Sequence, residues 1–209
     1  MKDCEGSSLS MLSVGDSMNF KRKYHSSYSK SAIYAAREAE AYSKLLRNLG
    51  KYGVDVVRVG EGVLRTGVVD EEGPRFDFML KVRRVDDGSE YVICYVEVTG
   101  DFIDDIYAYI LSEKIESARK ANYPVFIMYD KRRKRLWRVF SMRYIALKLD
   151  RGDLEMIKWL EDEKPYIKIP LAKGWYFARW VTWLRTHVIP YIMRRRENYN
   201  EWLNTWRVR

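Results

Sequence analysis

The most informative segment of this chain is a hairpin pattern in which two apolar runs each carry one acid. The runs are RFDFML (residues 75–80) and YVICYVEVTG (residues 91–100), and Asp86-Asp87-Gly88 between them is a strong turn signal. Asp77 stands between two phenylalanines, and Glu97 stands inside the second run. Burying a carboxylate costs several kcal/mol unless a cation or hydrogen bonds compensate. The two acids are therefore a candidate site for a divalent metal ion.

Strand alternation gives this site a geometry. On the second run, Glu97 shares one face with Tyr95 and Thr99, because successive side chains of a strand point to opposite faces. A hairpin can bring Asp77 onto that same face. Hard carboxylate oxygens that converge at short range are what Mg²⁺ or Mn²⁺ requires.

The first helix, expected over residues 29–49, carries an acid on its apolar face. At about 100° per residue, its apolar stripe consists of Tyr34, Tyr42, Leu45, Leu46 and Leu49. Glu38 falls in the middle of this stripe, whereas Glu40 falls on the opposite, solvated side. Glu38 is therefore a candidate third member of the site, with a structural pairing to a lysine or a tyrosine as the alternative.

A second helix, expected over residues 103–121, carries a positively charged residue on its apolar face. Its apolar stripe consists of Ile103, Ile106, Tyr107, Ile110, Leu111, Ile115 and Ala118. Lys114 lies near the centre of this stripe. A lysine directed at a sheet is costly unless it meets an acid or an anionic substrate. Lys114 is thus either a functional cation or the structural counter-ion of Glu97 or Glu38.

The remaining segments predict an α/β fold with a central mixed sheet flanked by helices. Residues 1–28 read as a loosely ordered arm, residues 29–142 as the core, and residues 143–209 as an aromatic, basic helical extension that packs on the core or forms a dimer interface. Strands are expected at 54–59, 124–129 and 136–140, a short strand within 60–74, a helix at 153–163, an extended segment at 165–170, and a long helix at 175–196 interrupted near Pro190.

The composition limits which partners and which kinds of metal site can be expected. The 209 residues include 38 Lys and Arg against 29 Asp and Glu, a formal charge of +9 that favours an anionic partner. Only two Cys and two His are present, too few for a cysteine–histidine zinc cluster. No apolar run approaches the roughly 20 residues of a membrane span, and no signal peptide is evident. We therefore expect no membrane partner and a cytoplasmic location, in a host cell if the protein is viral.

The order of these acids resembles that of the PD-(D/E)XK nuclease superfamily, and most closely its small archaeal and archaeal-virus members such as the Holliday-junction resolvases. The layout of that family is a helix with a glutamate, a strand with an aspartate, and a strand with Glu-x-Lys. Glu38, Asp77 and Glu97-Val98-Thr99 match these positions, and the resemblance covers roughly residues 30–140. It implies a restriction-endonuclease-like core that hydrolyses DNA, branched DNA included. The aromatic C-terminal segment is a candidate interface for a homodimer, which would present two sites to a symmetric junction.

The resemblance also implies roles for individual residues. Asp77, Glu97 and Glu38 would hold Mg²⁺ or Mn²⁺, which activates a water and offsets charge on the phosphodiester. The chain departs from the family at Thr99, which stands where a lysine is expected and carries no charge. Lys114 is the candidate replacement, so the predicted catalytic set is Glu38, Asp77, Glu97, Thr99 and Lys114.

Two basic clusters are candidate contacts for DNA phosphates. They are Lys131, Arg132, Arg133, Lys134 and Arg135 at an expected hairpin turn, and Arg194, Arg195 and Arg196 near the C-terminus. Because of Thr99, a second function stays open: a nuclease-fold protein that binds or assembles on DNA with little or no turnover. A third interpretation makes the acids and Lys114 a structural ion network.

Overall fold

The computed structural model describes residues 27–59, 76–101, 105–131, 136–158 and 164–194. The helices, with short 3₁₀ and π segments marked η, are α2 (Ser27–Leu49), η1 (Gly50–Tyr52), α3 (Ser112–Arg119), α4 (Met142–Asp150), η3 (Leu171–Lys173), α5 (Phe177–Trp183), η4 (Leu184–Val188) and α6 (Ile189–Arg194). The strands are β1 (Val54–Arg58), β2 (Phe78–Arg83), β3 (Glu90–Asp101), β4 (Tyr107–Leu111), β5 (Val125–Lys131), β6 (Leu136–Ser141), β7 (Glu155–Lys158), β8 (Pro165–Pro170) and β9 (Trp175–Tyr176).

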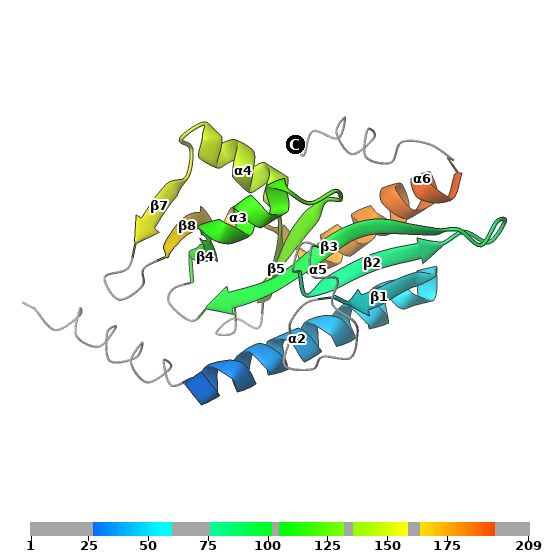
Figure 1. The fold of residues 1–209 in the computed structure, drawn as a ribbon, viewed down its shortest axis with the longest axis horizontal. Coiled ribbons are helices and arrows are strands. Elements are labelled where there is room, and N and C mark those ends of the chain that lie inside the picture. Colours follow the sequence, from blue (N-terminus) through cyan, green and yellow to red (C-terminus); the bar gives the residue numbers. More distant parts are fainter. Residues whose placement is uncertain (1–26, 60–75, 102–104, 132–135, 159–163, 195–209) are drawn as a thin grey trace, which may run out of the picture.

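A six-stranded mixed sheet in the order β1-β2-β3-β5-β6-β9 forms the centre of the molecule (Figure 1). Neighbouring strands are antiparallel except for β3 and β5, which are parallel, with Glu97 opposite Ile127. The connection between these two strands runs through β4 and α3, because parallel neighbours need a crossover. The predicted hairpin is confirmed as β2 and β3, and β1 begins at the predicted residue. The expected short strand within 60–74 lies outside the described residues.

A smaller three-stranded sheet, β4-β8-β7, corrects two predictions. Within the predicted helix over 103–121, Tyr107–Leu111 is the strand β4, and α3 begins only at Ser112. Ala108 and Ile110 point inward while their neighbours are half-buried, so the apolar spacing there follows the period of a strand. The predicted helix over 153–163 instead contains β7, whose pairing with β8 overrides the local preference.

Two hydrophobic clusters cover the two faces of the central sheet. On one face, α2 packs beside the C-terminal helices, with Leu45 and Trp180 in the same cluster. On the other face, α3 and α4 pack with the smaller sheet, through Ile115, Ile145 and Ile167. Figure 1 shows α2 running beside β1, and α4 with β7 and β8 at the end away from the β2–β3 hairpin. The central strands therefore lie between two apolar layers.

The described residues beyond 142 belong to this same architecture. Helix α4, which the sequence did not predict, packs beside α3, and β9 pairs with β6 in the central sheet. Helices α5 and α6 are joined without a break by the π-helical turn η4, in which Ile189 N–H donates to Leu184 O. The α-helical pattern is thus interrupted at Leu184–Val188, close to Pro190 as predicted, while the helical run itself continues and begins at Phe177 rather than at residue 175. A widened π turn directly before the proline accommodates a residue that has no backbone N–H.

Helix α2 has the predicted position but a shifted buried face. Ala41, Leu45 and Leu49 are fully buried, whereas Tyr34 and Leu46 of the predicted stripe are largely exposed. Within the described part of the chain, no helix combines the length and apolar character that a membrane crossing requires.

Candidate active site

Asp77 and Glu97 lie next to each other at the open end of the β2–β3 pair. Phe78 pairs with Val96, so the adjacent Asp77 faces Glu97 across the two strands. The backbone fixes Asp77 twice: its carbonyl accepts from Val59 N–H at 3.1 Å, and its Oδ2 accepts from Val98 N–H at 2.6 Å. Asp77 itself precedes the first residue of β2, a small shift from the predicted strand. The structure thus brings the two predicted carboxylates together.

Lys114 reaches this pair from α3. Its Nζ forms an ion pair with Glu97 Oε1, and the side chain of Glu97 is only 6% exposed. Lys114 is the third residue of α3. It therefore lies in the first turn of the helix, from which its side chain reaches β3. The predicted convergence of Lys114 on the strand acid is therefore present, although the helix that carries it is shorter than predicted.

Glu38 approaches the same place from α2, where it is half-buried. Burial raises the pKa of Glu38, and the neighbouring Asp77 raises it further, while Arg58 and Lys114 oppose the shift. Arg58, on β1, also stacks its guanidinium over the Tyr42 ring at 4.5 Å. Sequence analysis missed Arg58 as a member of the site. Its signal was a charge at the end of β1, a strand whose other charged residue, Asp55, is exposed.

The pKa values of Asp77 and Lys114 are shifted from their ordinary values. Burial raises the pKa of Asp77, against the opposing effects of the Val98 N–H and Lys114. Burial also lowers the pKa of Lys114, with Asp77 and Glu38 opposing the shift and Lys164 reinforcing it. Buried groups whose pKa values move toward each other are typical of functional sites, although structural ion pairs do the same.

Thr99 lies two residues beyond Glu97 on the same face, half-buried and opposite Tyr129 of β5. Next to it, Gly100 passes so close to β5 that a Cβ there would lie 2.3 Å from the Asp130 carbonyl oxygen. Asp130 in turn forms a buried ion pair with Arg37 of α2 at 3.4 Å. This pair, also missed in the sequence, ties α2 to the strand ends one residue before Glu38.

The three predicted metal ligands do not form a preformed three-ligand metal site. Within the described ranges, no group of three or more Asp, Glu, His or Cys side chains is arranged to hold a metal ion. A two-carboxylate site still fits, because Mg²⁺ commonly binds through one or two carboxylates together with substrate phosphates and waters. Asp77, which is half-buried, and Glu97, which is buried, supply hard-oxygen donors on facing positions. Glu38 is better placed as a neighbour of this pair than as a third ligand.

The predicted phosphate-binding clusters are only partly described. Lys131 ends β5 with its side chain buried, and its Nζ donates to Tyr107 O at 2.9 Å. It is therefore not a surface contact, which corrects the prediction. Arg194 is exposed at the end of α6. Arg132, Arg133, Lys134, Arg135, Arg195 and Arg196 lie outside the described residues.

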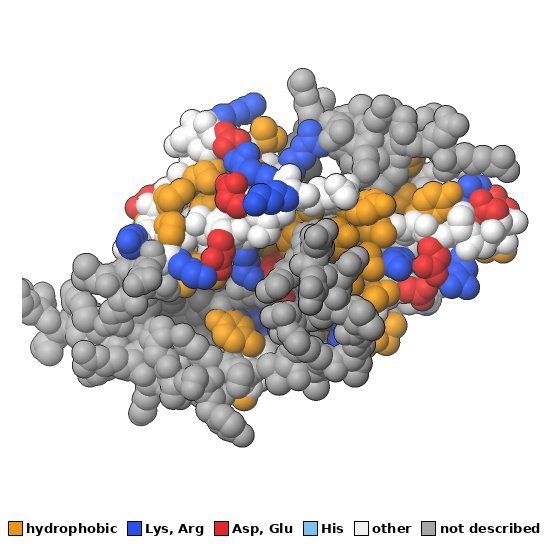
Figure 2. Space-filling model, in the orientation of Figure 1, with side chains coloured by type: hydrophobic (Ala, Val, Ile, Leu, Met, Phe, Trp, Pro, Cys, Tyr) orange, Lys and Arg blue, Asp and Glu red, His pale blue; other side chains and the backbone are white. Residues whose placement is uncertain are grey.

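The visible surface charge is mixed rather than basic throughout. On the face shown in Figure 2, Lys and Arg alternate with Asp and Glu over both the α3–α4 end and the β2–β3 hairpin. Many of these are ion pairs, such as Arg83 with Glu90 at 2.6 Å. The net charge of +9 therefore does not by itself locate a contact with nucleic acid.

Comparisons with known proteins support the fold. No protein family model matches the sequence, and no curated protein matches it. Among solved structures, a nuclease from a fusselovirus is similar with a TM-score of 0.50 and 21% identity, over 75% of this chain and 93% of that one. A Holliday junction resolvase from the archaeal hyperthermophile Archaeoglobus fulgidus gives a TM-score of 0.35 and 17% identity, over 68% of this chain and 94% of that one. The sheet topology and the likeness to the fusselovirus protein show that the chain has an α/β fold of the restriction-endonuclease-like kind, with a central mixed sheet flanked by helices.

Proposed function

We propose that this protein is a metal-dependent endodeoxyribonuclease, with Asp77 and Glu97 as ligands of Mg²⁺ or Mn²⁺. The observation that carries the proposal is the ion pair between Lys114 and Glu97. Lys114 of α3 places an ammonium next to Glu97 of β3. In the Glu-x-Lys pattern this charge would come from the position that Thr99 occupies here. The nuclease fold shared with the fusselovirus protein is consistent with this assignment.

Each residue has a task in the proposed reaction. A bound divalent ion would lower the pKa of a water and offset the charge that develops on the phosphodiester. Lys114 would stabilise that developing negative charge, because an ammonium in a partly dehydrated site acts strongly on a nearby anion. Glu38, whose pKa is raised by burial, would orient the attacking water and accept its proton. The Val98 N–H would hold the Asp77 carboxylate in place.

A cleavage assay tests this proposal. Linear, nicked and four-way-junction DNA are incubated with Mg²⁺, with Mn²⁺ and with EDTA. We expect cleavage that requires metal, that Glu97→Gln abolishes, and that Lys114→Ala lowers by about 10²-fold or more. The matched controls are Lys120→Ala, an exposed lysine next to the end of α3, and Glu155→Gln, an exposed acid of β7. Equal loss in a variant and its control would contradict the assigned roles.

A second function remains: a protein of nuclease fold that binds or assembles on DNA without turnover. Lys114 already neutralises Glu97, and an ammonium at this carboxylate competes with a metal ion. Salt-sensitive binding of DNA without cleavage in either metal would establish this alternative. Preference for branched DNA, the homodimer and the cytoplasmic location stay predictions. Sedimentation of the protein with and without a four-way junction tests the first two together.

A further inference from the structure

Two adjoining cavities lie away from the carboxylates, on either side of Trp175. The larger, of about 450 Å³, lies between α3, α4 and the two tryptophans Trp175 and Trp183. The smaller, of about 360 Å³, lies between β6, α4 and the segment around β9. They share Phe126, Ser141 and Trp175, so together they form one groove. Both volumes fall within the range of sites that bind small organic groups.

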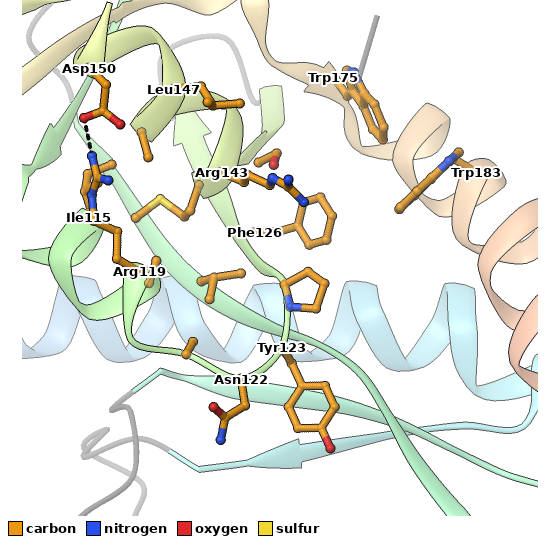
Figure 3. Close-up of a pocket in the computed structure, with 17 residues that line it drawn as sticks. Ile115, Arg119, Asn122, Tyr123, Phe126, Arg143, Leu147, Asp150, Trp175 and Trp183 are labelled. Atoms are coloured by element: carbon orange, nitrogen blue, oxygen red, sulfur yellow. Dashed lines mark hydrogen bonds and ion pairs between the residues drawn. The ribbon is translucent and has the colours of Figure 1, made fainter. Parts of the chain in front are cut away.

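The larger cavity has tryptophan rings on one side, and a mixture of apolar and charged side chains on the other (Figure 3). Trp175 and Trp183 contact each other edge to face, with ring centroids 5.3 Å apart. Figure 3 shows Arg143 and Leu147 on the opposite side, with Asp150 bound by Arg119 at 2.5 Å. Among the described residues that line this cavity, Asp150 is the one carboxylate, and it is already paired with an arginine.

The smaller cavity is basic. Arg138, Lys173 and Arg179 line it, and none of the described residues around it is acidic. The Arg138 guanidinium stacks 3.6 Å above the Tyr176 ring and donates to Gly174 O at 3.1 Å. Its buried Nε has no hydrogen-bond partner within the described part of the chain. Tyr176 is 55% exposed, so its ring is accessible beside three cations.

This combination has a specific ligand chemistry. Exposed aromatic rings along a positively charged groove bind unpaired bases by stacking while the cations follow the phosphates. In duplex DNA the bases are stacked inside the helix, so only the phosphates could contact a groove of this kind. The lining of the two cavities therefore fits a single strand better than a duplex.

We propose that the groove around Trp175 binds a single-stranded segment of DNA. Trp175 and Tyr176 stack on bases, and Arg138, Lys173 and Arg179 contact phosphates. The choice of DNA among polyanions rests on the proposed nuclease function. Helix α3 links the two places, since Lys114 contacts Glu97 while Arg119, about 7.5 Å further along the helix axis, borders the groove. The substrate class is then DNA in which a single strand adjoins a duplex.

Binding measured in EDTA tests the groove independently of cleavage. The probe is a fluorescein-labelled oligothymidylate of about 15 nucleotides, read by fluorescence anisotropy, with a duplex of equal length as comparison. We expect Tyr176→Ala to weaken binding of the single strand about tenfold. Arg179→Gln should reduce the slope of log K against log salt by about 0.7, the value for one lost contact on a single strand.

Arg185→Gln is the matched control. Arg185 is an exposed arginine six residues after Arg179 on the same helical run, and its guanidinium stacks on Tyr52 at 4.0 Å, outside the groove. Unchanged binding in Tyr176→Ala, equal effects of Arg179→Gln and Arg185→Gln, or tighter binding of the duplex than of the single strand would each overturn the proposal. If the single strand binds as expected but no DNA is cleaved in Mg²⁺ or Mn²⁺, the groove stands and the nuclease function fails.

Discussion

Replacing Lys114 by methionine will destabilise the protein, because it leaves two acids without their cation. Loss of one partner from a fully buried ion pair costs about 3–5 kcal/mol. Glu97 is nearly fully buried, but the Lys114 side chain is 30% exposed, so water already screens part of the interaction. We therefore expect a loss of about 2 kcal/mol in the free energy of unfolding at pH 8. For a chain of this length that corresponds to a fall of about 4–8 °C in Tm.

The loss will depend on pH, and its sign follows from Asp77. The pKa of Asp77 is already raised by burial, and Lys114 opposes that rise. Without Lys114 the pKa rises further. A carboxyl whose pKa is higher in the folded than in the unfolded state favours folding at low pH and loses this contribution as pH rises. The destabilisation in Lys114→Met should accordingly shrink to below about 1 kcal/mol near pH 5, where the acids can take up a proton.

Urea unfolding of four proteins measures this effect: wild type, Lys114→Met, Glu97→Gln and the double variant, each at about pH 5 and pH 8. The double variant should be more stable than the sum of the two single losses predicts, since neither charge is then left alone. Lys120→Met on the same segment should change stability little. Additive losses, or a Lys114→Met loss that is the same at both pH values, would refute the reasoning.

Three further predictions follow from the same region. Asp77→Asn should raise the free energy of unfolding at pH 7 by about 1 kcal/mol while abolishing cleavage, because the folded state disfavours the ionised carboxyl; a lower urea midpoint would contradict this. Gly100→Ala should cost more than about 2 kcal/mol, since its Cβ would lie 2.3 Å from a backbone oxygen, whereas Gly50→Ala, with only the side chain of Leu46 within 4 Å, should not lower the thermal midpoint. Thr99→Lys combined with Lys114→Ala should recover part of the cleavage that Lys114→Ala loses, because either position can present an ammonium to Glu97; no recovery in a folded double variant would argue that α3 alone gives the required geometry.

The strand part of the site could be predicted because its rules are local. Alternation with a period of two places Glu97 on a definite face, and the turn signal at Asp86-Asp87-Gly88 sets the partner strand. The register of β2 and β3 then brings Asp77 next to Glu97, as predicted. Helical phase also singled out Glu38, which is half-buried beside Asp77.

The position of Lys114 next to Glu97 was predicted from a partly wrong element. Residues 103–111 entered its predicted stripe, yet Tyr107–Leu111 is a strand that pairs with β8, more than 50 residues later in the chain. Short apolar runs do not distinguish a strand from a helix, and only the distant partner decides. The prediction for Lys114 survived because Ile115 and Ala118, the stripe residues nearest to it, do belong to α3.

Contacts between segments that are far apart in the sequence could not be predicted from the sequence. The Arg37–Asp130 pair links residues 93 positions apart, and Arg37 reads in the sequence as one of many surface arginines. Trp137 donating to Glu40 at 3.0 Å is a similar case, since Glu40 was expected to be merely solvated. A single sequence gives the periodicity of each element but not which elements become neighbours.

The position of Lys114 makes the charge balance at Glu97 depend on both layers of the fold. In the Glu-x-Lys pattern one strand supplies the acid and the cation together, so a single ladder fixes both. Here Glu97 comes from the central sheet, Lys114 from the layer of α3 and α4, and Glu38 from the layer of α2. Because α3 has only eight residues, too few for a stable isolated helix, its position relies on packing through Ile115. The charge balance at the carboxylates is therefore a property of the assembled tertiary structure, and a groove occupant that contacts α3 through Arg119 has a direct physical route to it.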